Sequence, residues 1–73
     1  MSDTVDARGY LCPQPVMMLV KKMKALGEGT FDILVDNETS RENVRRTAIG
    51  RSWSVVEDAE VEDYYRISVG KKA

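Results

Sequence analysis

Apolar residues recur at three- and four-residue steps in the segment that follows Cys12, and charged residues occupy positions between them. This spacing predicts a helix that begins near Cys12 and ends at Gly27. Glycine suits the carboxyl end of a helix because it adopts positive φ without steric cost. The buried face of this helix would consist of Val16, Leu19, Val20, Met23 and Leu26.

Four other segments favour β-strands. In Phe31–Asp36 apolar and polar residues largely alternate, which is typical of a strand with one buried face. Thr4–Ala7 is a short candidate for a starter strand. Trp53–Glu57 and Tyr64–Val69 are rich in β-branched and aromatic residues, and we expect them to form a hairpin joined by the acidic stretch 58–63.

A second helix is predicted between the strand that ends at Asp36 and this hairpin. Thr39 and Glu42 fit a capping box, in which each side chain accepts a hydrogen bond from the other residue's backbone amide. We expect the helix to reach about Ile49 and to stop at Gly50. Its inner face would include Val44, Thr47 and Ala48.

The resulting order β-α-β-α-β-β predicts an α/β (α+β) two-layer sandwich. Because β-α-β crossovers are right-handed, both helices would cover one face of a four-stranded mixed sheet. The chain has 73 residues, of which 42% are hydrophobic and 32% charged, which is the composition of an ordinary globular protein. We therefore expect residues 1–73 to form a single domain.

Charge and hydropathy argue against several kinds of partner. Eleven basic residues against twelve acidic ones give a formal net charge of -1, which does not favour direct nucleic-acid binding. No apolar run approaches the roughly 18 residues of a membrane-spanning helix, and the amino-terminal segment has no signal-peptide core. We therefore expect a cytoplasmic protein that does not bind membranes.

The cysteine and histidine content narrows the chemistry further. With no histidine and one cysteine, the sequence holds no Cys/His zinc set, no internal disulfide and no catalytic pair that needs an imidazole. Any chemistry must therefore centre on Cys12, on carboxylates or on backbone groups. We expect neither a metal ion nor a cofactor.

The candidate chemistry lies at the predicted start of the first helix. Pro13 suits the first helical position because its φ is already helical. Pro15 would fall within the first turn, where a missing N–H breaks no intrahelical bond. Cys12 would then occupy the cap, with the free amides of Gln14 and Val16 pointing towards its sulfur. Helix amino termini lower the pKa of thiols, so this position would increase the thiolate fraction.

Two interpretations of Cys12 remain open on position alone. It is either a reactive thiol or a small buried hydrophobe, which is the commonest fate of a free cysteine. Cysteine caps helices poorly compared with Ser, Thr, Asp or Asn, so its use at a cap favours a function. Asp6 is expected to support the loop before Cys12 through Arg8 or backbone amides, and Gly9 allows a sharp bend there.

The segment Asp6–Val16, with the sequence Asp-Ala-Arg-Gly-Tyr-Leu-Cys-Pro-Gln-Pro-Val, resembles the signature of the TusA/SirA-like family of small sulfur-carrier proteins. The centre of that signature is a Cys-Pro-x-Pro motif, which begins here at Cys12. The preceding Asp-x-x-Gly, the following lysine-bearing helix and the total length add to the resemblance, which covers nearly the whole chain. The family also shows the order β-α-β-α-β-β.

The resemblance implies a persulfide carrier rather than a stand-alone enzyme. Family members accept a sulfane sulfur on the motif cysteine, here Cys12, from a donor such as a cysteine desulfurase or a rhodanese-like enzyme. They pass it to an acceptor protein in a sulfurtransferase relay. The residues that would support this site are Asp6, Gly9, Pro13, Gln14 and Pro15. No second cysteine is present to discharge the persulfide internally.

The segment Val35–Val44 is more similar to the SirA-like domain of YedF-type proteins than to the tRNA-thiolation members, which usually carry an Asp-Asp-Pro turn here. YedF-type proteins are often linked with selenium metabolism, so the resemblance implies either sulfur or selenium as cargo. They commonly append a DsrE-like domain, which would here be a separate partner. The family often places Gly directly before an aromatic residue or His at the third strand, whereas here Ser52 precedes Trp53.

Basic and acidic residues are predicted to separate on the fold. The helices carry Lys21, Lys22, Lys24, Arg41, Arg45, Arg46 and Arg51, and the hairpin turn carries Glu57, Asp58, Glu60, Glu62 and Asp63. The helix layer is either an ordinary solvated surface or a docking surface for an acidic patch on a donor or acceptor. One of Met17 and Met18 must lie near the surface beside Cys12, where it would offer an adaptable apolar contact.

Three functional hypotheses remain. The first is a persulfide carrier with Cys12 as the accepting and donating residue. The second is a protein-interaction or regulatory module that docks partners without covalent sulfur. The third is a thiol redox sensor, which would need an intermolecular partner because no resolving cysteine exists.

Overall fold

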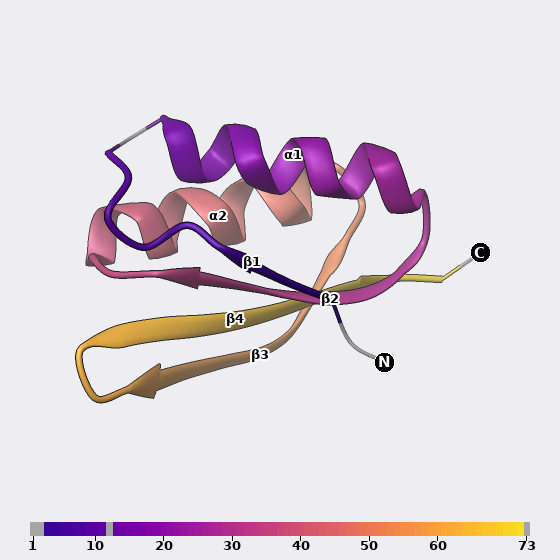
Figure 1. The fold of residues 1–73 in the computed structure, drawn as a ribbon. Coiled ribbons are helices and arrows are strands. Elements are labelled where there is room, and N and C mark those ends of the chain that lie inside the picture. Colours follow the sequence, from indigo (N-terminus) through magenta and orange to yellow (C-terminus); the bar gives the residue numbers. More distant parts are fainter. Residues whose placement is uncertain (1–2, 12, 73) are drawn as a thin grey trace.

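The computed structural model describes residues 3–11 and 13–72. Its elements follow the predicted order, and the predicted two-layer α/β sandwich is confirmed (Figure 1). They are β1 (Asp3–Asp6), α1 (Gln14–Leu26), β2 (Gly29–Val35), α2 (Glu38–Gly50), β3 (Ser54–Val61) and β4 (Tyr64–Lys71). None of the helices in these described residues is long and apolar enough to cross a membrane.

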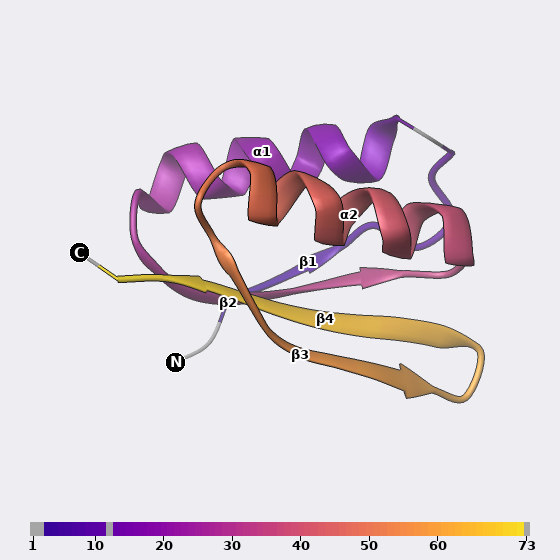
Figure 2. The same ribbon diagram turned by 180° about the vertical axis from the view of Figure 1, so that it is seen from behind.

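The four strands form one mixed sheet in the order β1-β2-β4-β3. β1 pairs parallel to β2, whereas β4 pairs antiparallel to both β2 and β3. Both helices lie on the same face of the sheet, side by side, as the two opposite views show (Figure 2). α1 begins at the end of the molecule that also holds the β2–α2 connection and the hairpin turn.

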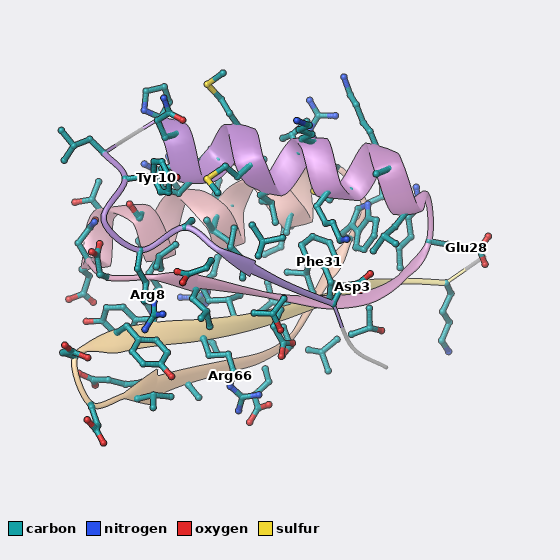
Figure 3. The ribbon with its side chains drawn as sticks, viewed as in Figure 1. Asp3, Arg8, Tyr10, Glu28, Phe31 and Arg66 are labelled. Carbon is teal, nitrogen blue, oxygen red and sulfur yellow. The ribbon has the colours of Figure 1, made fainter. Side chains whose placement is uncertain are left out.

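The core lies between the helices and the sheet. Alternate residues of β2 point into it, as the period of two predicts, whereas β4 is buried on both faces from Ile67 to Gly70. Phe31 lies between α1 and the sheet (Figure 3) and meets Trp53 edge-on, with ring centroids 5.6 Å apart. The fully buried side chains include Leu19, Phe31, Ile33, Val35, Val44, Ile67 and Val69.

The buried face of α1 is rotated slightly from the predicted one. Leu19 and Met23 are buried as expected, but Val16 and Val20 are only half-buried. Pro15 is fully buried instead, so the proline ring itself belongs to the core. The helix therefore leaves part of its predicted stripe at the surface.

The predicted cap of α2 is wrong. Asn37 rather than Thr39 is the N-cap, and its side chain accepts a hydrogen bond from the Ser40 amide at 2.8 Å. Asparagine ranks above threonine as an N-cap, which agrees with the earlier helix start. The capping box of Thr39 and Glu42 is therefore not formed, and both residues lie inside the helix.

The end of α2 also differs from the prediction. Gly50 is the last helical residue, and the turn to left-handed φ comes at Ser52, with φ of 67°. The amide of Trp53 donates to the Ala48 carbonyl at 2.9 Å, which closes the helix end. Trp53 itself precedes β3 and anchors the connection in the core.

The acidic stretch 58–63 is not a long loop. β3 continues to Val61, and the hairpin turn is confined to Glu62 and Asp63, with φ of 50° at Glu62. Asp58 points from β3 towards the helix layer, where the Arg41 Nε lies 3.1 Å from its carboxylate. An ion pair with a helix therefore accommodates a charged residue on the inner side of an edge strand.

Candidate functional site

The Cys-Pro-x-Pro segment leads into the amino terminus of α1. Cys12 lies outside the described residues, so its predicted place at the helix cap is not described. Pro13 is the N-cap, with no side-chain capping hydrogen bond, and Pro15 falls in the first turn. The prediction of Pro13 as the first helical residue is therefore wrong by one position, since α1 starts at Gln14. The Pro13 carbonyl still takes part in α1, because it accepts a hydrogen bond from the Met17 amide at 3.1 Å.

Gln14 does not offer a free amide. Its N–H donates to the carbonyl of Leu11 at 2.8 Å, across the cysteine. The prediction that this amide is free is therefore wrong, and its orientation towards the sulfur of Cys12 lies outside the described residues. The same bond ties the two sides of Cys12 together through the backbone.

The loop before the motif begins with a buried anchor. Ala7 is fully buried, and its amide donates to the Leu34 carbonyl at 2.9 Å, which continues the pairing of β1 with β2. The Asp6 carboxylate accepts hydrogen bonds from the Arg8 side chain at 2.9 Å and from the Arg8 amide at 3.1 Å. These bonds lower the pKa of Asp6 from 3.8 to about 2, with the Arg8 side-chain bond as the largest cause. Asp6 therefore contacts Arg8 as expected.

Gly9 supplies the sharp bend that the sequence predicted. Its φ is +83°, in the region that L side chains rarely adopt, and the space where a Cβ would project is open. Backbone conformation rather than crowding therefore calls for glycine here. The Gly9 amide donates to Asp36 Oδ2 at 2.7 Å, and Asp36 Oδ1 accepts from Asn37 Nδ2 at 3.1 Å. The loop is thereby tied to the β2–α2 connection.

Arg8 joins this loop to the hairpin. Its guanidinium lies 4.8 Å from the centroid of the Tyr64 ring, a cation–π contact, and it points towards β4 (Figure 3). Nearby charges and the Asp6 bonds raise the pKa of Arg8, with the Asp6 side-chain bond as the largest cause. A polar hollow next to the loop is lined by Asp6, Arg8, Gly9, Asp36, Asp63 and Tyr64.

Two residues of this site had no predicted functional role. Asp36 was predicted only as the end of a strand, and Tyr64 only as strand packing. The available signal for Asp36 was its place after β2 and before an asparagine, because consecutive Asp and Asn side chains often bond to nearby backbone. The partner of Asp36 is Gly9, which lies 27 residues away in the chain. Local sequence patterns cannot predict a contact between residues so far apart.

Large apolar side chains are exposed beside the motif. Leu11 is 81% exposed, Met17 60% and Tyr10 47%. Met18, by contrast, packs against the core, so the expectation that one of the two methionines lies at the surface is confirmed for Met17. Clusters of solvent-exposed apolar groups are typical of a protein contact surface.

A shallow groove runs along the outer side of α1 towards the end of α2. Its lining combines the polar Gln14 with apolar and basic groups: Val16, Met17, Met18, Val20, Lys21, Lys24 and Arg51. Ion pairs within the described residues neutralise other basic groups of the helix layer. Arg41 and Arg45 contact Asp58, and Lys22 contacts Asp3. Three of the expected basic side chains, Lys21, Lys24 and Arg51, line this groove, whereas Arg46 lies outside it and donates to Asn43 Oδ1.

Metal binding has no support in the described part of the chain. Residues 3–11 and 13–72 contain no group of three or more His, Cys, Asp or Glu side chains placed to hold a metal ion. The carboxylates next to the motif loop are instead held by Arg8, Gly9 and Asn37.

Comparison with known proteins gives a consistent match. The family model described as sulfurtransferase TusA matches residues 3–71. A protein of Archaeoglobus fulgidus, provisionally described as a sulfur carrier protein, is 35% identical over 68 residues, which cover 92% of this chain and 93% of that protein. The sulfur carrier protein TusA of Pseudomonas aeruginosa is 30% identical over 70 residues, which cover 94% of this chain and 89% of that protein.

A solved structure shares the fold. The crystal structure of the SirA-like protein from Desulfitobacterium hafniense superimposes with a TM-score of 0.85 at 34% sequence identity. The match covers 92% of this chain and 93% of that chain. The predicted resemblance to the TusA/SirA-like family is thereby confirmed.

Proposed function

The chain belongs to the TusA family, and we propose on that premise that it is a sulfur carrier whose Cys12 holds the sulfur as a persulfide. The observation that carries the proposal is the position of the only cysteine. It lies in a Cys-Pro-x-Pro motif, two residues before Gln14, the first residue of α1, in a chain that the family model matches from residue 3 to residue 71. We further propose that residues 1–73 act as one carrier domain.

The proposed transfer needs no cofactor. The Cys12 thiolate attacks the outer sulfur of a persulfide on the donor, and the sulfur–sulfur bond of the donor breaks. The donor cysteine leaves as a thiolate, and Cys12 becomes a persulfide whose terminal sulfur keeps its proton. In the second step an acceptor thiolate attacks that terminal sulfur, and Cys12 returns to the thiolate. Each step exchanges one sulfur–sulfur bond for another, so no external oxidant or reductant is consumed.

The geometry around the motif supports presentation of this sulfur to another protein. The loop before Cys12 is held at Ala7, Arg8 and Gly9, whereas Leu11 and Pro13 on either side of the cysteine are exposed. Fixed positions at Ala7, Arg8 and Gly9 would reduce the conformational entropy lost when the reacting atoms are aligned. The absence of a second cysteine keeps the persulfide from being discharged within the chain.

We propose that the donor is a cysteine desulfurase or a rhodanese-like enzyme and that the acceptor is a separate protein, for which a DsrE-like protein is the candidate. The groove on α1 is the proposed docking surface, because its apolar floor and its Lys21, Lys24 and Arg51 rim fit an apolar patch edged with acidic residues. The groove starts at Gln14 and therefore adjoins the motif. Direct RNA binding is not part of the proposal.

The cargo and compartment are proposed on the same basis. Similarity of the segment Val35–Val44 to YedF-type proteins leaves selenium beside sulfur as a proposed cargo. A cytoplasmic location is proposed because a lone thiol stays reduced there, which the carrier cycle needs.

The function is tested by label transfer. Purified protein is incubated with a cysteine desulfurase and cysteine labelled with radioactive sulfur, and the label is followed on non-reducing gels. A carrier takes label that dithiothreitol releases, whereas Cys12→Ala and Cys12→Ser take none. A protein-interaction module would bind the desulfurase without taking label, and a redox sensor would form a mixed disulfide instead. Failure of the wild type with both a desulfurase and a rhodanese would contradict the proposal.

The docking surface is tested by charge reversal. Lys21→Glu and Lys24→Glu should each weaken binding to the desulfurase by about three- to tenfold at low salt, and the loss should shrink at high salt. Lys72→Glu is the matched control, since this exposed lysine lies outside the groove. Equal losses from all three variants would indicate a general effect of net charge and would contradict docking at the groove.

A further inference from the structure

Asp36 bonds the backbone of the motif loop. Its Oδ2 accepts the Gly9 amide at 2.7 Å, and this contact joins the end of β2 to a loop 27 residues earlier in the chain. Asp36 is exposed and pairs with no arginine or lysine among the described residues, so this bond is not part of an ion-pair network. Gly9 is the residue at which the loop turns, with φ of +83°.

The Asp36 carboxylate is itself held in place. Asn37 Nδ2 donates to its other oxygen at 3.1 Å, and Asn37 Oδ1 accepts the Ser40 amide at 2.8 Å. The asparagine that caps α2 therefore also orients the aspartate that holds the motif loop. Three successive hydrogen bonds connect the amino terminus of α2 to the bend that leads into Cys12.

We propose that Asp36 is a positioning residue for transfer through Cys12, an inference that rests on the proposed function. Asp36 fixes the bend at Gly9, and only Tyr10 and Leu11 separate this bend from the motif cysteine. Attack on a persulfide needs the attacking sulfur in line with the sulfur–sulfur bond, so a small displacement of the loop slows the step strongly. Asp36 does not take up a proton or touch the cargo in this proposal.

The hollow beside the loop provides an internal control. Asp63 lines the same hollow as Asp36 and carries the same charge, but the contacts among the described residues give it no bond to Gly9. Asp63→Asn therefore removes a nearby negative charge without removing the tether. Asp36→Asn removes the charge of Asp36 but keeps one acceptor oxygen. Asp36→Ala removes both the charge and the acceptor oxygens.

The experiment measures sulfur transfer from a persulfidated desulfurase to each variant over a range of carrier concentrations. Asp36→Ala should lower kcat by about tenfold and leave KM within about twofold of the wild type. Asp36→Asn should lower kcat by about threefold. Asn37→Ser keeps an acceptor for the Ser40 amide but loses the donor to Asp36, and it should lower kcat by about two- to threefold. Asp63→Asn should match the wild type.

A second readout does not depend on sulfur. Hydrogen exchange of the Gly9 amide should accelerate by at least about tenfold in Asp36→Ala, because the amide loses its acceptor. The positioning role is overturned if kcat is unchanged in Asp36→Ala, if KM alone rises, if Asp63→Asn loses as much, or if Gly9 exchange does not change. A wild type that takes no sulfur overturns the proposed function itself, so the two failures are distinguishable.

Discussion

Replacement of Asn37 by alanine tests which residue caps α2. The structure assigns the cap to Asn37, whose side chain accepts the Ser40 amide at 2.8 Å. Loss of an asparagine N-cap costs about 1 kcal/mol, within a range of about 0.5–2. Thr39 is the second residue of α2 and is exposed. Thr39→Ala should therefore raise the free energy of unfolding by up to about 0.5 kcal/mol, because alanine has the higher helix propensity. The two substitutions therefore have opposite signs.

The assay is equilibrium unfolding in urea at neutral pH, followed by circular dichroism. A 73-residue domain has a free energy of unfolding of roughly 4–11 kcal/mol, so a change of about 1 kcal/mol is large. With a urea dependence of about 1 kcal/mol per M, the midpoint of Asn37→Ala should fall by about 1 M. Asn37→Asp keeps a capping oxygen but loses the donor to Asp36, so its stability should lie between that of the wild type and that of Asn37→Ala.

The assignment of the cap to Asn37 is refuted if the two substitutions have the opposite effects on stability. If Thr39→Ala lost about 1 kcal/mol while Asn37→Ala lost little, the capping box would be the true start of α2. The tether between Asn37, Asp36 and Gly9 would then lack its support. An unchanged slope with urea is needed in each variant, because a changed slope would indicate an altered unfolded state.

Three further predictions concern the same end of the fold and its connections. Ser40→Ala should leave stability unchanged or raise it by up to about 1 kcal/mol in urea unfolding, because the buried Ser40 hydroxyl has no hydrogen-bond partner among the described residues; a loss would contradict this. Ser52→Gly should raise stability by about 0.5–1 kcal/mol because φ is 67° there, whereas Ser54→Gly, in a strand, should lower it by a similar amount; losses from both would show that Ser52 is not strained. Carboxyl NMR should find the Asp6 pKa at about 2, and Arg8→Ala should return it towards 3.8. Since this folded-state pKa is below the unfolded value, the contribution of Asp6 to stability is present above about pH 4 and is lost as the pH falls towards 2. An Asp6 pKa that did not respond to Arg8→Ala would contradict the assigned cause.

Periodicity was sufficient to predict the fold. The strand Phe31–Asp36 buries Phe31, Ile33 and Val35, and α1 buries Leu19 and Met23, as the apolar spacing indicated. These patterns are informative because burial of an apolar face is the largest favourable contribution to folding and acts along the whole element. The element order then left few arrangements that satisfy right-handed crossovers.

Element ends were predicted less well, because several residues compete for each one. Asn37 and Thr39 are both good caps, and the structure uses Asn37, the stronger of the two cap types. Gly50 was predicted to end the helix, yet α2 includes Gly50, and the backbone adopts positive φ only at Ser52. The amide of the buried Trp53 bonds to the Ala48 carbonyl and closes the end of this helix.

Long-range polar contacts were the main features that the sequence did not reveal. The acidic stretch 58–63 was predicted as a loop because strands disfavour Asp and Glu. Asp58 is accommodated in β3 because Arg41 and Arg45 of α2 form ion pairs with its carboxylate. Likewise, the motif cysteine and its prolines were evident, but the tether from Gly9 to Asp36 depends on folding of the sheet. Contacts between residues so far apart in the chain produce no periodic pattern in the sequence.

The measurement that tests the central claim most directly is mass spectrometry of the intact protein after loading by a cysteine desulfurase and cysteine. Peptide mapping under non-reducing conditions then locates the added mass. The account predicts one added sulfur atom, located on Cys12, removed by dithiothreitol and absent from Cys12→Ala. An intact mass without added sulfur after loading by both a desulfurase and a rhodanese, or equal sulfur on the Cys12→Ala protein, would contradict it.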